Sequence, residues 1–222
     1  MSKRSPRGGT GQARGPFISR DLRSLDLSAI TLASDDSFID FQIDDSTIKS
    51  ETVEGIAFRS GHLNRASFRN ASLPRLELSD LKFLDCDLAN AKLPNASVLR
   101  VELTRCRLTG TCLTESYLQD LQMNDCVGNL SQFRFSKLKS CRFHGCDLRD
   151  ADFQGADLTN AVFSECDLRN AEMSQAILMG ADLTSSNING LRVNQESLKG
   201  LVLEPHQAAS VASLFGVEVR WT

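Results

Sequence analysis

The sequence predicts an all-β solenoid with a square cross-section, and two observations lead to this fold class. Every fifth residue from Phe38 to Leu203 is large and apolar, and among these 34 positions Gly128 is the one exception. Every twentieth residue from Ser46 to Ser186 is small, and five consecutive members of that column are cysteines. A repeat that continues over most of the chain takes precedence over local composition in assigning the fold.

A period of five fits neither a regular helix nor a straight strand. On an α-helix, five residues advance the chain by about 500°, so successive apolar residues would point to different faces. On a straight strand, an odd period would alternate between the two faces. The apolar series stays buried only if the chain turns a corner once per repeat, which winds it into coils stacked about 4.8 Å apart.

The small column sets the size of each coil. Residues that recur every 20 positions lie above one another if a coil has four sides of five residues each. The cysteines of this column are expected to form a structural ladder in the core, because buried cysteine behaves as a small apolar residue. They are Cys86, Cys106, Cys126, Cys146 and Cys166. Cys141 takes the same inward slot on another side, whereas Cys112 falls at an outward position and is the candidate accessible thiol.

Three regions are expected along the chain. Residues 1–16 are rich in Gly, Arg, Ser and Pro and predict a flexible basic tail. Residues 17–203 are expected to form the solenoid, because apolar residues keep the same spacing from Phe17 onward, with one residue inserted before Phe38. Residues 204–222 are expected to form a C-terminal cap or dimerisation element. Within the solenoid, Gly128 predicts a local bulge.

The C-terminal element is expected to be a helix followed by a strand. Pro205 is suited to the first position of a helix that runs to about Phe215, and Gly216 is placed to end it. An open solenoid end exposes its core, so one face of this helix is expected to plug the last coil, through Ala208, Val211, Ala212 and Phe215. After the helix, apolar and polar residues alternate as in a half-buried strand. The candidate cap and dimer residues are Val211, Leu214, Phe215, Val217, Val219 and Trp221.

The repeat unit resembles that of a known family. Segments 151–155 (Ala-Asp-Phe-Gln-Gly), 156–160 (Ala-Asp-Leu-Thr-Asn) and 166–170 (Cys-Asp-Leu-Arg-Asn) are similar to the unit of pentapeptide-repeat proteins. The resemblance implies a right-handed quadrilateral parallel β-helix, here of about nine coils. The helix and strand at the C-terminus resemble the ends of the quinolone-resistance members, which dimerise there. For this chain, capping alone and a homodimer through this end both remain open.

The sequence contains no recognisable catalytic or metal-binding motif. The three histidines share no motif, no nucleophile and base are placed together, and the cysteine spacing of 20 is not that of zinc ligand pairs. We therefore expect no enzyme activity, cofactor or metal. No stretch is long and apolar enough to span a membrane, and no apolar segment follows the basic N-terminus. The expected location is the cytoplasm.

The net charge of −3 hides an uneven distribution. Residues 1–20 contain five Lys and Arg and no acid, so the rest of the chain carries −8. Residues 141–185 contain eight acids against three Arg, although the middle of the chain is net basic. Stacked coils would place Asp147 under Asp167 and Asp152 under Glu172. The candidate acidic docking surface comprises Asp147, Asp150, Asp152, Asp157, Asp167, Glu172 and Asp182.

Two functions follow from this surface. Regularly spaced carboxylates imitate the charge of duplex DNA, and the resemblance implies a DNA mimic that binds a type II topoisomerase, DNA gyrase or topoisomerase IV, and protects it from quinolones. The alternative is a repeat scaffold for another protein partner, in which the acids serve only solubility. Direct binding of nucleic acid is not expected, because the net charge of −3 gives no basis for simple electrostatic attraction.

Overall fold

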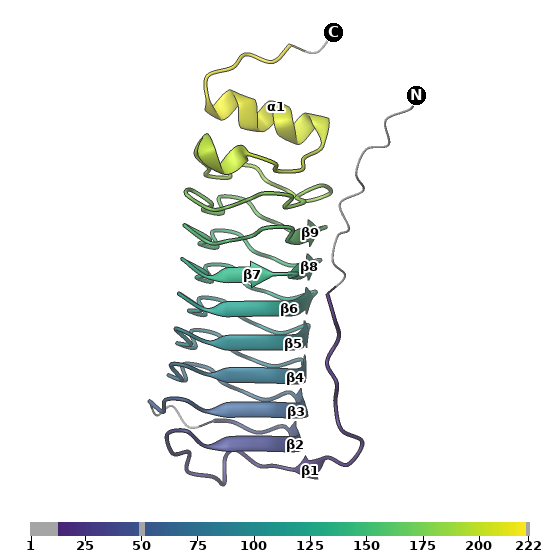
Figure 1. Cartoon of the computed structure of the whole chain (residues 1–222), viewed down its shortest axis with the longest axis vertical. Coiled ribbons are helices and arrows are strands. Elements are labelled where there is room, and N and C mark those ends of the chain that lie inside the picture. Colours follow the sequence, from purple (N-terminus) through teal and green to yellow (C-terminus); the bar gives the residue numbers. More distant parts are fainter. Residues whose placement is uncertain (1–12, 49–51, 221–222) are drawn as a thin grey trace, which may run out of the picture.

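The structure is a computed structural model that describes residues 13–48 and 52–220, and it is a single sheet wound into a solenoid (Figure 1). Among the described residues, the strands run along the stack in chain order, followed by a short 3-10 helix and one α-helix. The strands are β1 (Arg23–Ser24), β2 (Ser37–Asp44), β3 (Ala57–Asn64), β4 (Glu77–Leu84), β5 (Ser97–Thr104), β6 (Tyr117–Asn124), β7 (Lys137–Lys139), β8 (Arg142–His144) and β9 (Val162–Ser164). The helices are η1 (Glu196–Leu198) and α1 (Pro205–Leu214).

All pairing between coils is parallel, with a step of 20 residues. One ladder begins where β1 pairs with β2, Ser24 beside Gln42, and continues through the same position of each later coil. It passes Gln122 and Arg142 and ends where Asp182 pairs with Val202. Eight steps of 20 residues thus follow the shorter first step. The parallel β-helix expected from the sequence is confirmed.

Each coil has four sides, which we name from the coil at residues 136–155. Side A is 136–139, side B is 141–144, side C is 146–149 and side D is 151–154. Each side has its own column of parallel bridges, for example Lys137 with Asp157 on side A and Asp147 with Asp167 on side C. The second pairing confirms the stacking expected from the sequence, as does that of Asp152 with Glu172 on side D.

The corners of the coils lie at residues whose numbers are multiples of five. With the exception of Gln195, each described corner from Asp35 to Gly200 has a positive φ, between 49° and 76°. Asn, Asp and Gly tolerate this left-handed region best. Arg, Leu and Phe also occupy it here, as at Arg100, Leu130 and Phe135. This backbone turn is the once-per-repeat corner that the period of five requires.

The core consists of the apolar fifth residues and the small residues two positions before them. Phe143 is fully buried and stacks on Phe163 of the next coil, with ring centroids 4.5 Å apart. The five-cysteine ladder is buried and reduced, as expected, and the Cys146 thiol donates to the carbonyl of Met123. Small inward residues leave room for the large ones, which gives each coil a filled interior.

Gly128 does not form the expected bulge. The bridges of Arg107 with Val127 and of Val127 with Asp147 continue through this coil without interruption. The missing side chain is compensated from the next coil, because Leu148 Cδ2 lies 3.1 Å from the position that a Cβ of Gly128 would take. The space is therefore filled by a neighbour and the backbone stays regular.

The N-terminal boundary differs from the expected one. Phe17 is 72% exposed and lies outside the core, although it keeps the apolar spacing. The coil ladder begins at β1, and Leu27 is the first fully buried apolar residue. Within the described residues no coil precedes β1, and the segment that contains Phe17 runs along the outside of the stack (Figure 1). The flexible tail expected over residues 1–16 lies mostly outside the described residues.

The C-terminal helix is confirmed, but its contact with the last coil is not the expected one. α1 ends at Leu214, before Gly216 with its φ of 77°. Val211 is buried, whereas Ala208 and Phe215 are exposed. The main plug is polar: Gln207 is 2% exposed, and its Nε2 donates to the carbonyls of Leu183 and Ser186. These bonds satisfy backbone acceptors at the open end of the stack.

Residues 217–220 form no strand, contrary to the expectation from the alternating pattern. Val217 and Val219 are 53% and 38% exposed and have no neighbouring strand. Alternation indicates a strand only where a sheet edge is available, and α1 covers the end of the solenoid. Trp221 lies outside the described residues.

The Phe stack predicts a large loss of stability on truncation. Phe143→Ala should lower the free energy of unfolding by about 3–5 kcal/mol, because it removes a fully buried ring and leaves a cavity beside Phe163. Phe135→Ala, at an exposed corner, should change it by less than about 1 kcal/mol. Urea denaturation followed by circular dichroism measures both, and equal losses would contradict the assigned core.

Candidate protein-docking surface

The candidate acidic residues do not share one surface. Asp147 and Asp167 lie on side C, Asp152 and Glu172 lie on side D, and Asp150 occupies the corner between them. These five form one continuous acidic band on two adjacent sides, which we call the C/D band. The remaining two lie elsewhere, since Asp157 is on side A and Asp182 is on side B.

Arginines interleave with the acids on side C. The Arg149 guanidinium donates to Asp147 at 2.7 Å and lies 3.8 Å from Asp167, one coil above. Arg169 donates to Asp167 at 2.6 Å. These hydrogen bonds hold the pKa of Asp147 and of Asp167 below their ordinary values. Paired acidic and basic side chains therefore alternate along side C.

Side D is paired in a similar way. Arg192 Nε lies 2.8 Å from Glu172, and Arg134 Nε lies 3.7 Å from Asp152. Asp150, at the corner, makes no side-chain hydrogen bond or ion pair among the described residues. The C/D band thus carries less net negative charge than its acids alone suggest.

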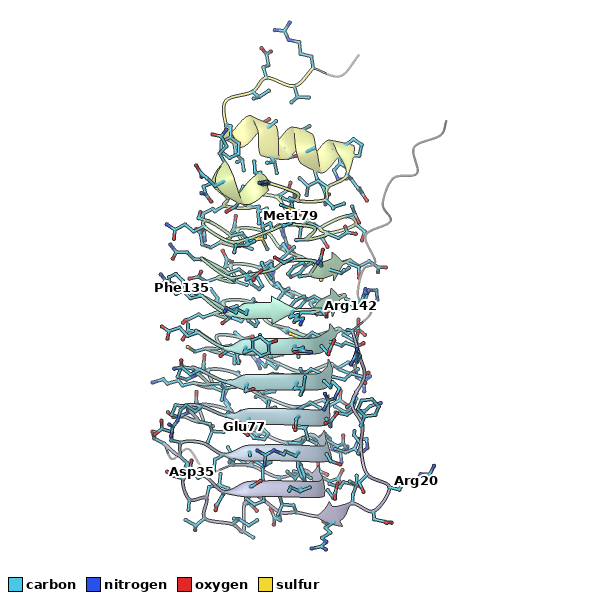
Figure 2. All side chains as sticks on the ribbon, viewed as in Figure 1. Arg20, Asp35, Glu77, Phe135, Arg142 and Met179 are labelled. Carbon is cyan, nitrogen blue, oxygen red and sulfur yellow. The ribbon has the colours of Figure 1, made fainter. Side chains whose placement is uncertain are left out.

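Two bulky apolar residues at corners lie beside this band and were not identified from the sequence. Leu130 and Phe135 both have left-handed φ values, 60° and 56°, and both are 53% exposed. They flank side D in the coil immediately before Asp150 and Asp152. Figure 2 shows Phe135 projecting at the outer edge of the stack. The Arg134 guanidinium lies 5.6 Å from the centre of the Phe135 ring, and the ring covers the corner at Gly155.

A left-handed backbone costs a non-glycine residue about 1 kcal/mol or more. Most apolar side chains offset such a cost by burial, but these two leave about half of their surface in water. Val127, 44% exposed on side C, extends the same apolar area. Bulky apolar residues that are both strained and exposed indicate a surface that becomes covered by a partner.

The basic residues of the middle coils are largely paired. At the corner between sides B and C, Arg65 bonds Asp45 and Arg105 bonds Asp85, in each case one coil below. The column alternates in sign from coil to coil and ends at Asp125. The net positive charge of the middle therefore does not form a free basic surface.

The thiols separate into two environments. Cys112 lies outward on side D, half-buried, with its Sγ 3.5 Å from Thr114 Oγ1. Cys141 is fully buried, and burial raises its pKa to about 12. Within the described residues, no group of three or more His, Cys, Asp or Glu could hold a metal ion. The helices of this part are all too short to cross a membrane.

The candidate dimer residues gather at the C-terminal end of the rod, in and after α1. Leu214, Phe215, Val217 and Val219 are each at least 38% exposed, whereas Val211 is turned into the last coil. They form an apolar area separate from the C/D band. Whether a second copy covers it is a matter of proposal.

The two thiol environments predict selective labelling. In the native protein, a maleimide should react quickly with one thiol per chain, because the six others are buried and the reagent cannot reach them. Cys112→Ser should abolish the fast reaction, and the matched change Cys126→Ser should leave it intact. Mass spectrometry of the labelled protein measures this. A second thiol that reacts at the same rate would show that the ladder is open to solvent.

The pairing of Arg149 with Asp147 predicts that the pKa of Asp147 depends on this arginine. Arg149→Gln should raise the pKa of Asp147 toward its ordinary value of about 3.9, because it removes the charged donor. Arg142→Gln, on side B, is the control. Because the pKa is lowered in the folded state, Asp147 stabilises the fold above its ordinary pKa and loses this effect as the pH falls through the lowered value. Carbon-detected NMR titration measures the shift, and an unchanged pKa in Arg149→Gln would contradict the pairing.

Comparisons with known proteins agree with this architecture. The model described as pentapeptide repeat region matches residues 76–153 and 96–173, and that described as pentapeptide repeats (8 copies) matches residues 161–195. No curated protein sequence matches the chain. A trypsin-treated form of QnrB1, a plasmid-mediated fluoroquinolone resistance protein, is 19% identical over 89% of this chain and 95% of that chain, with a TM-score of 0.38.

Two cyanobacterial structures are similar at the same level. Rfr23 from Cyanothece 51142 is 20% identical over 55% of this chain and 91% of its own, with a TM-score of 0.37. HetL from Nostoc sp. strain PCC 7120, a protein involved in heterocyst differentiation regulation, is 19% identical over 76% and 87%, with a TM-score of 0.30. The two family models together span residues 76–195, more than half of the sequence, and the chain belongs to the pentapeptide-repeat family.

Proposed function

We propose that the chain is a non-enzymatic, cytoplasmic protein-binding rod that docks a partner on sides C and D of its later coils. The observation that carries this proposal is the pair of strained, exposed apolar corners, Leu130 and Phe135. Both stand at the edges of side D, immediately below the C/D band. An apolar anchor with a charged rim is the usual anatomy of a protein interface.

The partner that this surface fits has its own apolar pocket and basic groups. Phe135 supplies an aromatic anchor beside Arg134, and Asp150 offers an unpaired carboxylate next to Leu130. The acids of side C are already paired with Arg149 and Arg169. A partner therefore gains most from contacts at the corner between sides C and D, and less from a general attraction to negative charge.

A more specific proposal is a DNA mimic that binds and protects a type II topoisomerase. Its support is the stacking of carboxylates at coil spacing, Asp147 with Asp167 and Asp152 with Glu172. Charges repeated at about 4.8 Å along a rod are comparable in spacing to the phosphates along one DNA strand, about 3.4 Å apart. The resemblance of the repeat to the quinolone-resistance group makes DNA gyrase the first partner to test.

The alternative is a scaffold for a different protein partner, and a separate observation favours it. The arginines of sides C and D neutralise much of the acidic band, which a uniform DNA mimic would leave bare. In that case the apolar corners are the contact and the acids keep the rod soluble. In either case, the exposed apolar area at the C-terminal end is proposed as a homodimer contact.

A supercoiling assay with purified DNA gyrase, with and without a fluoroquinolone, tests the specific proposal. The wild-type chain should inhibit or protect the enzyme at micromolar concentration or below. Two variants should each weaken the effect at least tenfold. One carries Asn in place of Asp147, Asp150, Asp152 and Asp167, all in the C/D band, and the other carries Leu130→Asn with Phe135→Asn.

The matched control is Ile39→Asn with Ile177→Asn, which removes two apolar side chains of similar exposure from side A. Asn tolerates left-handed corners, so Leu130→Asn and Phe135→Asn should not lower the thermal stability. No effect of the wild type on gyrase would overturn the topoisomerase proposal. An effect that needs the apolar corners but not the four acids would favour apolar docking over DNA mimicry.

A further inference from the structure

The N-terminal segment lies along the outside of the rod at the corner between sides A and B. Figure 1 shows it rising beside the strands after it leaves the end of the stack. The Ser19 N–H donates to Ser60 Oγ at 2.9 Å, and the Phe17 N–H donates to Asp80 Oδ1 at 2.9 Å. Farther up, the Arg14 N–H donates to Asp120 Oδ1 at 3.2 Å. Three backbone donors thus contact the corners of three different coils.

The spacing of these contacts follows from geometry. From Phe17 to Arg14, three residues of extended chain span about 10 Å, and two coils from Asp80 to Asp120 also span about 10 Å. An extended segment along the rod axis therefore brings the N–H groups of Phe17 and Arg14 to corners that lie two coils apart. The corner column of Ser60, Asp80, Arg100 and Asp120 has the right period to receive such a segment.

The column also has the right chemistry. Arg100 forms two hydrogen bonds with Asp80, both of 2.6 Å, and its guanidinium lies 5.4 Å from the centre of the Phe17 ring. Asp120 is 5% exposed, an unusually buried carboxylate for the outside of a rod, and it also accepts a hydrogen bond from Gln119. Although burial acts to raise it, hydrogen bonds from Arg100 and the Phe17 N–H hold the pKa of Asp80 below its ordinary value. The Asp80 carboxylate thus remains a charged acceptor for a backbone donor.

The segment is held at the surface and is not part of the core. Phe17 is 72% exposed, so its ring covers Arg100 on one face only. Gly15 has nothing within 4 Å of its Cβ position. Contacts of this kind are exchangeable, because few apolar atoms are buried and the bonds involve backbone groups that any extended peptide possesses.

We propose that this corner column is a binding site for an extended peptide with an aromatic residue, and that residues 13–19 occupy it in cis as a displaceable strap. The site lies diagonally across the rod from the corner between sides C and D, so it is a second interaction surface, independent of the proposed docking surface. An extended partner segment with an aromatic residue in the place of Phe17 would replace the strap. Release of the strap would expose Asp80 and Asp120.

The test uses the full-length chain and a fluorescein-labelled peptide of residues 13–20 (Ala-Arg-Gly-Pro-Phe-Ile-Ser-Arg), followed by fluorescence anisotropy. Phe17→Pro removes the N–H that donates to Asp80 and the ring over Arg100, and so weakens the strap without touching the core. This variant should bind the peptide at least tenfold more tightly than the wild type. Gly15→Ala, which adds a methyl group into open space, should bind like the wild type.

The site of binding is tested in the Phe17→Pro background. Asp80→Gly should weaken peptide binding at least tenfold, whereas Asp85→Gly should not. Both positions have a positive φ that glycine accepts, and both aspartates pair with an arginine one coil above, so the two variants are matched. Hydrogen exchange of the Phe17 amide in the otherwise wild-type chain gives a second readout. This amide should be protected, and Asp80→Gly should remove the protection.

Three outcomes would overturn the proposal. The first is equal peptide binding by the wild type and Phe17→Pro, which would show that the strap does not occupy the binding site. The second is no loss of binding in Asp80→Gly, which would place the peptide elsewhere. The third is a concentration-dependent dimer that Phe17→Pro dissociates, which would show that the strap enters the site of a second copy.

Discussion

The left-handed corner at every fifth residue is the constraint on which the whole molecule depends. It turns the chain by about a quarter of a full turn at each repeat. The third residue of each repeat therefore points into the core, and the corner side chain points out. Each such corner costs a non-glycine residue about 1 kcal/mol or more. The hydrogen bonds between coils and the stacked core offset this cost, as where Phe143 lies on Phe163. These corners set the spacing of the outward-pointing side chains on every side of the rod.

The interior could be predicted from the sequence because the repeat acts on every coil alike. Period five identified the buried positions, and the column from Cys86 to Cys166 fixed the 20-residue coil, both of which the structure confirms. The ends could not be predicted in this way. Phe17 keeps the period, but no coil of the described residues lies below it, and Gln207 caps the last coil through hydrogen bonds that a search for apolar residues misses.

The surface was predicted less well, for a related reason. The acids were identified as a group along the sequence, but the corners separate Asp157 and Asp182 from the C/D band by placing them on other sides. Leu130 and Phe135 are visible in the sequence only once the multiples of five are known to be left-handed. Asp80 and Asp120 gain their role from a segment more than 60 residues away, which no local pattern indicates.

A stack of nearly identical coils carries a hazard of its own, because an intermediate that skips one coil still buries its apolar residues. The corner column of Asp45, Arg65, Asp85, Arg105 and Asp125 opposes this error. When consecutive coils of the chain stack on one another, each carboxylate of this corner lies beside a guanidinium. When one coil is left out of the stack, two carboxylates lie side by side, and their repulsion destabilises the misfolded arrangement. The alternation of charge along this corner therefore favours the correct order of the coils during assembly.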